Sequence, residues 1–333
     1  MRRLVTLSWF DAVGDGAIVE IDLARGVAIE RLRWFPPPHL RVPTKGFTGA
    51  CWGRSTSGEV ALYVAHHAAI VRVDPVRWKV TGVLHHPCFN DLHDVATDGS
   101  RLYVANTGAE SLDIFTLDGT FVGSHALLPL WINRLRETGA APSDWAPLLH
   151  AGWTGLAPEW NSADDHDPYL TRGTPWCRAK VRDRLHPCHV HCADGRLLVT
   201  CLHDGSIRDL AAFEVLASVR GHPHDGMLVD GVLWYTTVDG TIHAPDAVLD
   251  ATAAGHHGWC RGLHVSEGIV TVGFSEVRPG RPPKYAWNAR GPTGSETSVL
   301  AIDRATGELA GRVDLTDRAR HSKVFAVLPA EAP

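Results

Sequence analysis

The sequence predicts an all-β protein folded as a six-bladed β-propeller. The first observation is a repeated pattern of two short apolar strands joined by an Asp-Gly or similar turn, then a polar loop and two more strands. The repeat is about 40 residues long, which is typical of four-stranded propeller blades. The second is that no convincing amphipathic helix occurs outside 130–150. The third is that the two ends of the chain carry complementary parts of one further blade.

Five complete repeats follow one another along the chain, and each is expected to form one blade. They cover 46–86, 91–128, 186–221, 222–249 and 259–315, and the fourth strand of 222–249 is poorly marked. The segment 321–329 has the pattern of a first strand with nothing after it, and 4–34 has that of strands two to four with nothing before them. Joined, these segments predict a sixth blade that closes the ring and removes exposed sheet edges. Residues 1–333 are therefore expected to form a single propeller domain.

The blade sequences DGSRLYVANTG (98–108) and DGVLWYTTVDG (230–240) share one pattern of turn, strand and turn. With these repeats, nearly the whole chain resembles the six-bladed propellers of the NHL and SMP-30-like kind. The resemblance implies the architecture and does not imply an activity. The pattern of acidic and Asn ligands found in SMP-30 lactonases is not evident, so lactonase activity is not implied.

Two insertions are expected on the face of the ring where the inner strands begin. The longer, 130–185, lies between the fourth strand of one blade and the first strand of the next, and 276–297 lies between a second and a third strand. The longer insertion holds five of the twelve tryptophans, and a long tryptophan-rich loop favours a lid over disorder. Trp153, Trp160 and Trp176 are predicted to contact a substrate; the alternative is that these rings form only the small core of the lid.

Histidine is unusually abundant, with 20 residues against 9 Phe and 5 Tyr. Counting back from the second strand of each blade places four of them near the start of an inner strand, where they are predicted to hold a metal ion in the central channel: His93, His189, His224 and His321. The corresponding residues of the other two blades are Thr48 and Arg261. Strand alternation places His191 on the same side as His189, so His191, and likewise His264, are alternative ligands.

Neutral imidazoles favour a divalent transition metal, here iron or zinc, over calcium or magnesium. Four histidines without a carboxylate resemble the iron site of the carotenoid-cleaving oxygenases, which are seven-bladed. Three histidines plus water resemble the zinc site of the six-bladed peptidyl-hydroxyglycine amidating lyases. These resemblances imply oxygenase chemistry for a four-histidine site and lyase or hydrolase chemistry for a three-histidine site. The predicted function is a metal-dependent enzyme that acts on a small organic molecule.

Other side chains near the predicted channel are assigned supporting roles. Arg261 is predicted to bind a carboxylate or phosphate of the substrate, His203 to act as an acid or base at the mouth, and Thr48 to contact the substrate. Asp94 and Asp225 directly follow two of the histidines. Regular strand geometry points them away from the channel, where they would orient the imidazole of a neighbouring blade. The alternative for the whole set is that these histidines serve packing alone.

Composition sets the remaining expectations. A formal net charge of −5 and a pI near 6.5 give no basic surface for nucleic acid or an anionic membrane. No apolar stretch approaches the roughly 20 residues of a membrane span. Seven cysteines without an evident export signal favour reduced thiols, so the protein is expected in the cytoplasm. Two further hypotheses stay open: a metal-free propeller that binds a peptide, a sugar or a protein, and a structural metal that ties the blades together.

Overall fold

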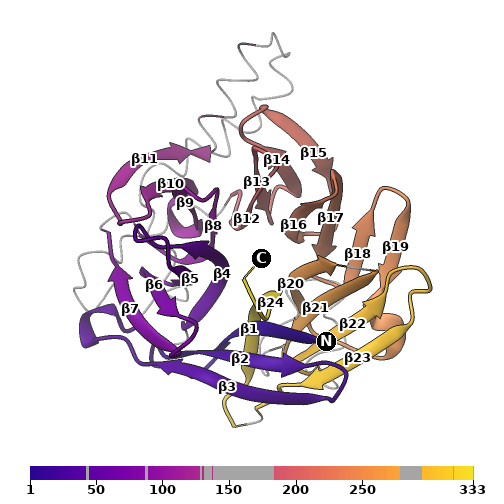
Figure 1. The fold of residues 1–333 in the computed structure, drawn as a ribbon. Coiled ribbons are helices and arrows are strands. Elements are labelled where there is room, and N and C mark those ends of the chain that lie inside the picture. The colour runs from indigo at the N-terminus through magenta and orange to yellow at the C-terminus, as the bar shows by residue number, and fades with distance from the viewer. Residues whose placement is uncertain are drawn as a thin grey trace, which may run out of the picture.

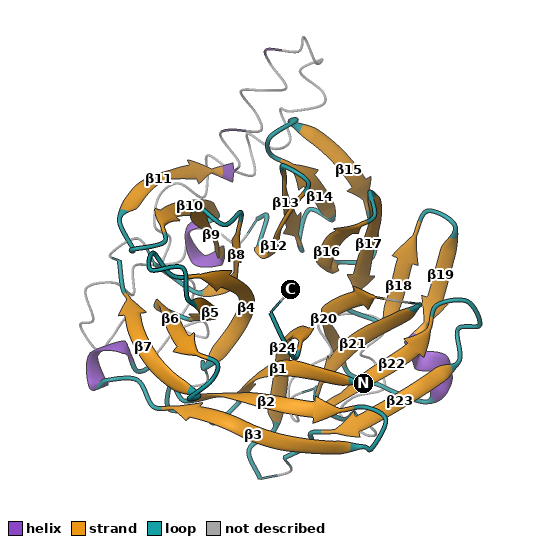
Figure 2. Ribbon diagram, in the orientation of Figure 1, coloured by secondary structure: helices purple, strands orange, loops and turns teal. Residues whose placement is uncertain are grey.

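The computed structural model is a closed ring of six four-stranded antiparallel sheets (Figure 1). It confirms the predicted all-β, six-bladed propeller, and strands make up nearly all of its regular structure (Figure 2). No helix in the described part of the chain is long and apolar enough to cross a membrane. The residues that the structure describes are 1–42, 45–86, 89–127, 130, 137, 184–266, 268–277, 295–317 and 319–332.

The first three blades follow one another in the chain, and the first strand of each lies nearest the axis of the ring (Figure 1). Blade 1 consists of β4 (Phe47–Arg54), β5 (Val60–His66), β6 (Ala69–Asp74) and β7 (Lys79–Leu84). Blade 2 consists of β8 (Leu92–Thr97), β9 (Arg101–Asn106), β10 (Ser111–Thr116) and β11 (Phe121–Ala126). Blade 3 consists of β12 (Pro187–Ala193), β13 (Arg196–Cys201), β14 (Ser206–Asp209) and β15 (Glu214–Ser218).

The other three blades complete the ring, with short 3₁₀ turns between some strands. Blade 4 consists of β16 (Pro223–Val229), β17 (Val232–Thr237), β18 (Thr241–Ala244) and β19 (Ala247–Asp250). Blade 5 consists of β20 (Trp259–Ser266), β21 (Ile269–Ser275), β22 (Ser298–Asp303) and β23 (Leu309–Asp314). Blade 6 consists of β24 (Ser322–Pro329), β1 (Arg2–Trp9), β2 (Gly16–Asp22) and β3 (Val27–Trp34). The 3₁₀ turns are η1 (Pro38–Leu40), η2 (Thr107–Ala109) and η5 (Ala251–Ala254).

Two details of the sequence prediction are confirmed by the pairing of strands. Blade 6 has the order β24-β1-β2-β3, so the last strand of the chain is the inner strand of a blade whose other strands come from the N-terminal segment. The poorly marked fourth strand of 222–249 is β19, which pairs with β18 from Thr241↔Asp250 to Ala244↔Ala247. The pairing in blade 6 closes the ring, so its inner strand is not left at an exposed edge.

A buried ion pair ties the two parts of blade 6 together on the side where β24 begins. Arg320 donates two hydrogen bonds of 3.0 Å to the carboxylate of Asp15, which is only 1% exposed. The Arg320 and Arg33 guanidinium groups lie 4.3 and 4.5 Å from the ring of Trp9. Burial opposes ionisation of Asp15, but the hydrogen bonds and charge of Arg320 outweigh it and lower the pKa of this carboxyl. The closure of the ring therefore includes a charged contact as well as strand pairing.

The hydrophobic core lies between neighbouring blades. In one cluster Val5 and Val19 of blade 6 pack with Val299 and Val313 of blade 5, and all four are at most 5% exposed. Similar clusters of alternating strand residues join the other blades. Burying each such side chain contributes about 1.5–3 kcal/mol. These contacts hold the six inner strands in fixed positions around the axis.

The inner strands all begin on one side of the ring, which we call the mouth face. Glu110, in the second-to-third connection of blade 2, accepts backbone N–H bonds from Arg184 and Leu185 just before β12. Its own carbonyl accepts from the N–H of Leu127, just after β11. Both described ends of the 130–185 insertion therefore meet at the mouth face. Most of this insertion lies outside the described residues, so its role as a lid stays a prediction.

Candidate active site

Every inner strand carries a β-bulge, because its register against its partner shifts once in all six blades. A bulge places two residues opposite one and re-aims their side chains. The shift follows the first residue of the strand in blades 1 to 4 and the third residue in blades 5 and 6, so a count from the first residue gives equivalent levels only in blades 1 to 4. The residues one position on are Thr48, His93, Cys188, His224, Cys260 and Lys323. The residues two positions on are Gly49, Asp94, His189, Asp225, Arg261 and Val324.

This register corrects the predicted equivalence of the four histidines. Only His93 and His224 occupy the same level, whereas His189 lies one residue deeper, level with the carboxyl groups that follow them. His321 precedes its strand and has a left-handed backbone (φ 52°), as do His186 (φ 55°) and His222 (φ 44°) before theirs. Counting a fixed number of residues back from the second strand placed His189 one residue away from the level of His93 and placed His321 before its strand, because the count ignored the bulges and the hairpin lengths.

A cavity of about 310 Å³ occupies the centre of the ring. Residues of the inner strands of all six blades line it, and the candidates among them are His93, Asp94, His189, His191, His224, Asp225 and His264. Its deeper wall includes Trp52, Cys192 and Met227, and Phe325 of β24 also lines it. Its size suits a small organic molecule. His321, Arg261, His203 and Thr48 are not among the residues that line this cavity.

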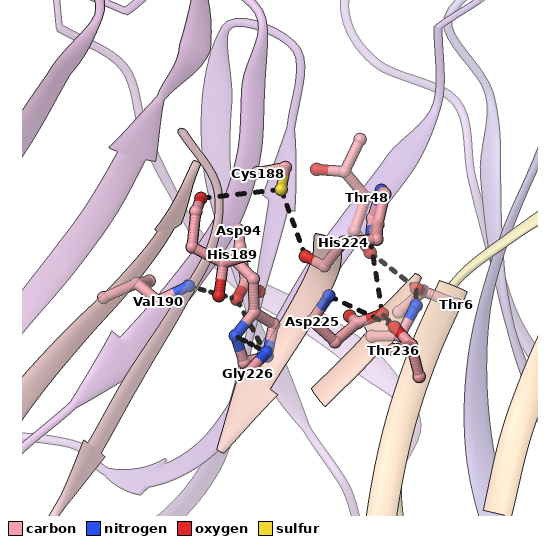
Figure 3. Close-up of polar contacts among 12 residues, drawn as sticks. Thr6, Thr48, Asp94, Cys188, His189, Val190, His224, Asp225, Gly226 and Thr236 are labelled. Atoms are coloured by element: carbon pink, nitrogen blue, oxygen red, sulfur yellow. Dashed lines mark hydrogen bonds and ion pairs between the residues drawn. The ribbon is translucent and has the colours of Figure 1, made fainter. Parts of the chain in front are cut away.

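Asp94 and His189 form a contact between blades 2 and 3 (Figure 3). Nε2 of His189 lies 3.6 Å from Oδ2 of Asp94, and the same oxygen accepts a 3.0 Å hydrogen bond from the backbone N–H of Val190. Nδ1 of His189 accepts from the N–H of Gly226 at 3.4 Å, so in the neutral ring the proton is on Nε2 and is directed at Asp94. Both His189 nitrogens are therefore engaged by the protein.

The Asp94 carboxyl is 5% exposed and sits against the backbone of Gly49 in blade 1. A Cβ atom at position 49 would overlap Oδ1 of Asp94, so glycine is what allows the carboxyl to lie there. Burial raises the pKa of Asp94 to about 6, and the repulsion of Asp225 adds to it, while His189 and the N–H of Val190 oppose the rise. A carboxyl whose pKa is near neutrality can both accept and return a proton at physiological pH.

Asp225 occupies the equivalent level in blade 4 but has a different environment (Figure 3). Its Oδ2 accepts a 2.9 Å hydrogen bond from the Thr236 hydroxyl and lies 3.3 Å from Nδ1 of His224. Burial opposes ionisation, but His224, His189 and Thr236 together lower the pKa of Asp225 below its usual value. Two carboxyl groups in one cavity thus have pKa values shifted in opposite directions, a pattern typical of paired catalytic carboxylates.

Burial favours the neutral form of four imidazoles at the cavity. Burial lowers the pKa of His191 and of His264 to about 4, and it lowers the pKa values of His93 and His224. Nδ1 of His93 donates to the carbonyl oxygen of Asp91 at 3.1 Å, and Nδ1 of His224 donates to Asp225. In both rings Nε2 therefore carries a lone pair, which is the tautomer that a metal-binding histidine needs.

The predicted four-histidine metal centre does not fit this arrangement. Within the described ranges, no group of three or more His, Cys, Asp or Glu side chains is placed so that it could hold a metal ion. Both nitrogens of His189 are engaged, and His321 lies outside the cavity wall, with Nδ1 3.8 Å from the buried carboxylate of Glu276.

Several aromatic rings and Arg261 lie together at the mouth face. The ring of His93 is 4.8 Å from that of His186, and His186 is 4.7 Å from His203. The guanidinium of Arg261 lies 4.4 Å from the ring of Phe325, whose centre is 6.2 Å from His93. The predicted roles of Arg261 and His203 are thus assigned to side chains that adjoin the cavity without lining it. Trp153, Trp160 and Trp176 lie outside the described residues.

Sequence reasoning missed the main feature of this site. Asp94 and Asp225 were expected to point away from the channel, yet both line it, because the bulge breaks regular alternation at that level. A signal was present in the two His-Pro pairs at 186–187 and 222–223. Aligning them makes His189 equivalent to Asp225 rather than to His224. The nearness of Phe325 to the mouth had no local signal, because it depends on how the ring closes.

Comparison with known proteins establishes the fold. No family model matches the chain, and no curated protein matches it. Among solved structures it resembles a nidogen/laminin complex with 11% identity and a TM-score of 0.57, and a Bacteroides caccae protein of unknown function with 8% identity and a TM-score of 0.55; each match covers 98% of this chain and 97% of the other. A virginiamycin B lyase from Staphylococcus aureus matches 81% of this chain and 77% of its own, with 10% identity and a TM-score of 0.44. At these identities the similarity shows the propeller architecture alone.

Proposed function

We propose that the central cavity is the active site of an enzyme that transfers a proton to or from a small organic molecule, in a lyase or hydrolase reaction. The observation that carries this proposal is the carboxyl of Asp94, which is buried in the cavity wall with its pKa raised to about 6. Strongly shifted carboxyl groups in a cavity of this size are typical of catalytic sites. Asp94 is the acid–base group, and His189 positions it.

The proposed reaction uses the carboxyl of Asp94, which lines the cavity. Oδ2 accepts from the N–H of Val190 and faces Nε2 of His189, and Oδ1 lies against Gly49. In the lyase version the carboxylate takes a proton from a carbon atom, the electron pair of that C–H bond forms a double bond, and a leaving group departs from the next carbon. The protonated carboxyl then gives the proton to the leaving group. Arg261 and His203, at the mouth, are proposed to meet an anionic group of the substrate and to exchange protons with solvent.

A metal-dependent version, with iron or zinc, is a second proposal. It is supported by the hydrogen bonds of His93 and His224, each of which uses Nδ1 as a donor and leaves Nε2 available. A metal bound at these two residues would supply a Lewis acid or activate a bound oxygen ligand, as lyase, hydrolase or oxygenase chemistry requires. Elemental analysis of protein purified without an affinity tag tests this version. Iron or zinc at about one ion per chain supports it, and a metal-free preparation with undiminished turnover removes it.

The proton-transfer proposal is tested by comparing the wild-type protein with Asp94→Asn. Each protein is incubated with a mixture of small metabolites, and mass spectrometry measures which compounds disappear. We expect at least one compound to be consumed by the wild type about 10²- to 10⁴-fold faster than by the variant. Consumption at equal rates would contradict the role of Asp94. If the wild type consumes no compound, the alternative of a metal-free module that binds a peptide, a sugar or a protein is favoured.

A further inference from the structure

The chemistry of the central cavity changes along its length. In blades 2 to 4 the residues two positions after the start of each inner strand are polar and line the cavity: Asp94, His189 and Asp225 (Figure 3). Two residues further along a strand, side chains point to the same side again. In blades 1 to 4 these deeper residues, which we call the rear level, are Cys51, Ala96, His191 and Met227, and all four line the cavity. None of them is Asp, Glu, Lys or Arg.

The apolar side chains at this depth are packed on one side and exposed on the other. Cys51, Met227 and the neighbouring Trp52 and Cys192 each pack against a different hydrophobic cluster between blades. All four are nevertheless only half-buried, whereas Cys260 is fully buried. Because all four line the cavity, the exposed part of each faces its interior. Covering this surface with an apolar group of a ligand is favourable, since it removes apolar area from water.

The kinds of side chain at the rear level favour an aromatic ring in particular. The indole of Trp52 is held in place because its Nε1 donates a 2.9 Å hydrogen bond to the carbonyl oxygen of Pro329, the last residue of β24. The polar edge of this indole is thereby engaged, and its ring is left for apolar contact. The sulfur atoms of Met227, Cys51 and Cys192 are polarizable, and methionine sulfur makes favourable contacts with aromatic rings. Two aromatic rings also attract each other in offset or edge-on arrangements.

We propose that the ligand of the cavity carries an aromatic ring that lies at the rear level against Met227 and Trp52, while its reacting group lies near Asp94. This inference rests on the proposed function, which it narrows to small aromatic substrates. It assigns Met227 and Trp52 to binding and specificity and leaves Asp94 to the chemistry. The inner strands of all six blades bound the cavity, and its volume of about 310 Å³ limits the occupant to a small molecule.

The chain contains a selective reporter for this ring, because Met1 and Met227 are its only methionines. Full-length protein labelled with ¹³C at the methionine methyl groups gives one NMR signal from each, and Met227→Leu identifies the second. Met1 packs against the cluster between blades 5 and 6 and does not line the cavity, so its signal is the internal reference. An aromatic ring bound against Met227 shifts the Met227 signal through its ring current and leaves that of Met1 in place.

Three uncharged probes of similar size are titrated into the wild-type protein: benzyl alcohol, cyclohexylmethanol and 1,2,6-hexanetriol. We expect benzyl alcohol to shift the Met227 signal saturably. Its affinity is expected to exceed that of cyclohexylmethanol about threefold or more, through ring contacts with sulfur and indole, and that of 1,2,6-hexanetriol about tenfold or more, through apolar burial. Absence of a saturable shift at Met227, or equal affinity for benzyl alcohol and either other probe, would overturn the inference. This comparison needs no variant that could fail to fold.

Variants then locate the ring. Met227→Gln is expected to weaken benzyl alcohol binding about tenfold, because the bound ring would take the new amide group out of water without offering it a hydrogen bond. Val229→Gln is the matched control: Val229 lies on the same strand and packs against the same interblade cluster, but it does not line the cavity, so the affinity is expected to stay unchanged. Calorimetric titration measures both. An unchanged affinity in Met227→Gln, or an equal loss in both variants, would contradict the assignment.

The outcomes for the ligand and for the proposed function can be distinguished. Binding of benzyl alcohol as expected, together with unchanged turnover in Asp94→Asn, would support the aromatic ligand and remove the proton-transfer role. Loss of turnover in Asp94→Asn without a saturable shift at Met227 would support the role of Asp94 and remove the aromatic ligand.

Discussion

Replacing Asp94 with Asn is expected to make the protein more stable at alkaline pH while abolishing its activity. The folded-state pKa of Asp94 is about 6 against 3.8 for the unconstrained carboxyl. The folded state therefore binds this proton more tightly than the unfolded state, and the stabilisation it gives is complete below about pH 3.8 and lost as the pH rises through 6. At pH 8 the ionised carboxyl destabilises the fold by about 3 kcal/mol, since each pKa unit corresponds to about 1.4 kcal/mol.

Asparagine removes this penalty because it has the same shape and no charge. Its side-chain oxygen can still accept the hydrogen bond from the N–H of Val190, which is 3.0 Å long in the wild type. Unfolding entropy of about 2 cal/mol/K per residue gives about 0.7 kcal/mol per kelvin for a chain of this length, so about 3 kcal/mol corresponds to a rise in Tm of about 4 °C. Asp94 is almost fully buried, so solvent screening reduces this value little.

The measurement is the difference in Tm and in urea-unfolding free energy between Asp94→Asn and the wild type at pH 8 and pH 4. We expect a gain at pH 8 that disappears by pH 4. Asp225→Asn is the internal control, because the pKa of Asp225 is lowered in the fold and its neutral replacement is expected to reduce stability at pH 8. If Asp94→Asn is less stable than the wild type at pH 8, or if both variants shift stability in the same direction, the account of the two carboxyls is wrong.

Three further predictions concern the surroundings of the site and the frame of the ring. Gly49→Ala is expected to lower the unfolding free energy by about 1–3 kcal/mol, because the added methyl group overlaps the carboxyl of Asp94. In the control Gly123→Ala the methyl group meets no atom within 4 Å, so little change is expected; urea unfolding measures both. Arg320→Ala leaves the Asp15 carboxylate buried without its main partner, and a loss of about 3–5 kcal/mol is expected; a loss below 1 kcal/mol would show that strand pairing alone closes the ring. Burial lowers the pKa of His66 from 6.5 to about 4, so the unfolded state binds the proton first and the unfolding free energy falls as the pH drops from 6.5 to 4. His66→Gln is expected to reduce this fall by about 3 kcal/mol, and an unchanged dependence of stability on pH would contradict the prediction.

The blades were predictable from the sequence because their signals are local. Alternating apolar residues and Asp-Gly turns mark each strand, and β19 forms even where its marking is weak, because β18 has an unpaired edge to offer. The closing blade followed from the same reasoning, since 321–329 and 4–34 each lacked the strands that the other supplied.

The site was predicted only in part, because its geometry depends on departures from regular strand structure. His93, His189 and His224 do line one cavity, as their positions in the repeat suggested. The position of His321 was wrong because it precedes its strand with a left-handed backbone. The orientation of Asp94 was wrong because a single extra residue in β8 turns it toward the channel. A one-residue irregularity of this kind has no clear signature in the composition of the strand.

The bulges of blades 2 to 4 give their part of the wall a modular chemistry. In these three blades the bulge follows the first residue of the inner strand, and the residues one and two positions on line the cavity in each of them. Exchanging residues between levels would then redistribute charge around the lumen without rebuilding the scaffold. Homologous or designed propellers can in this way diverge in ligand preference through a few substitutions at the positions one and two residues after the start of these inner strands.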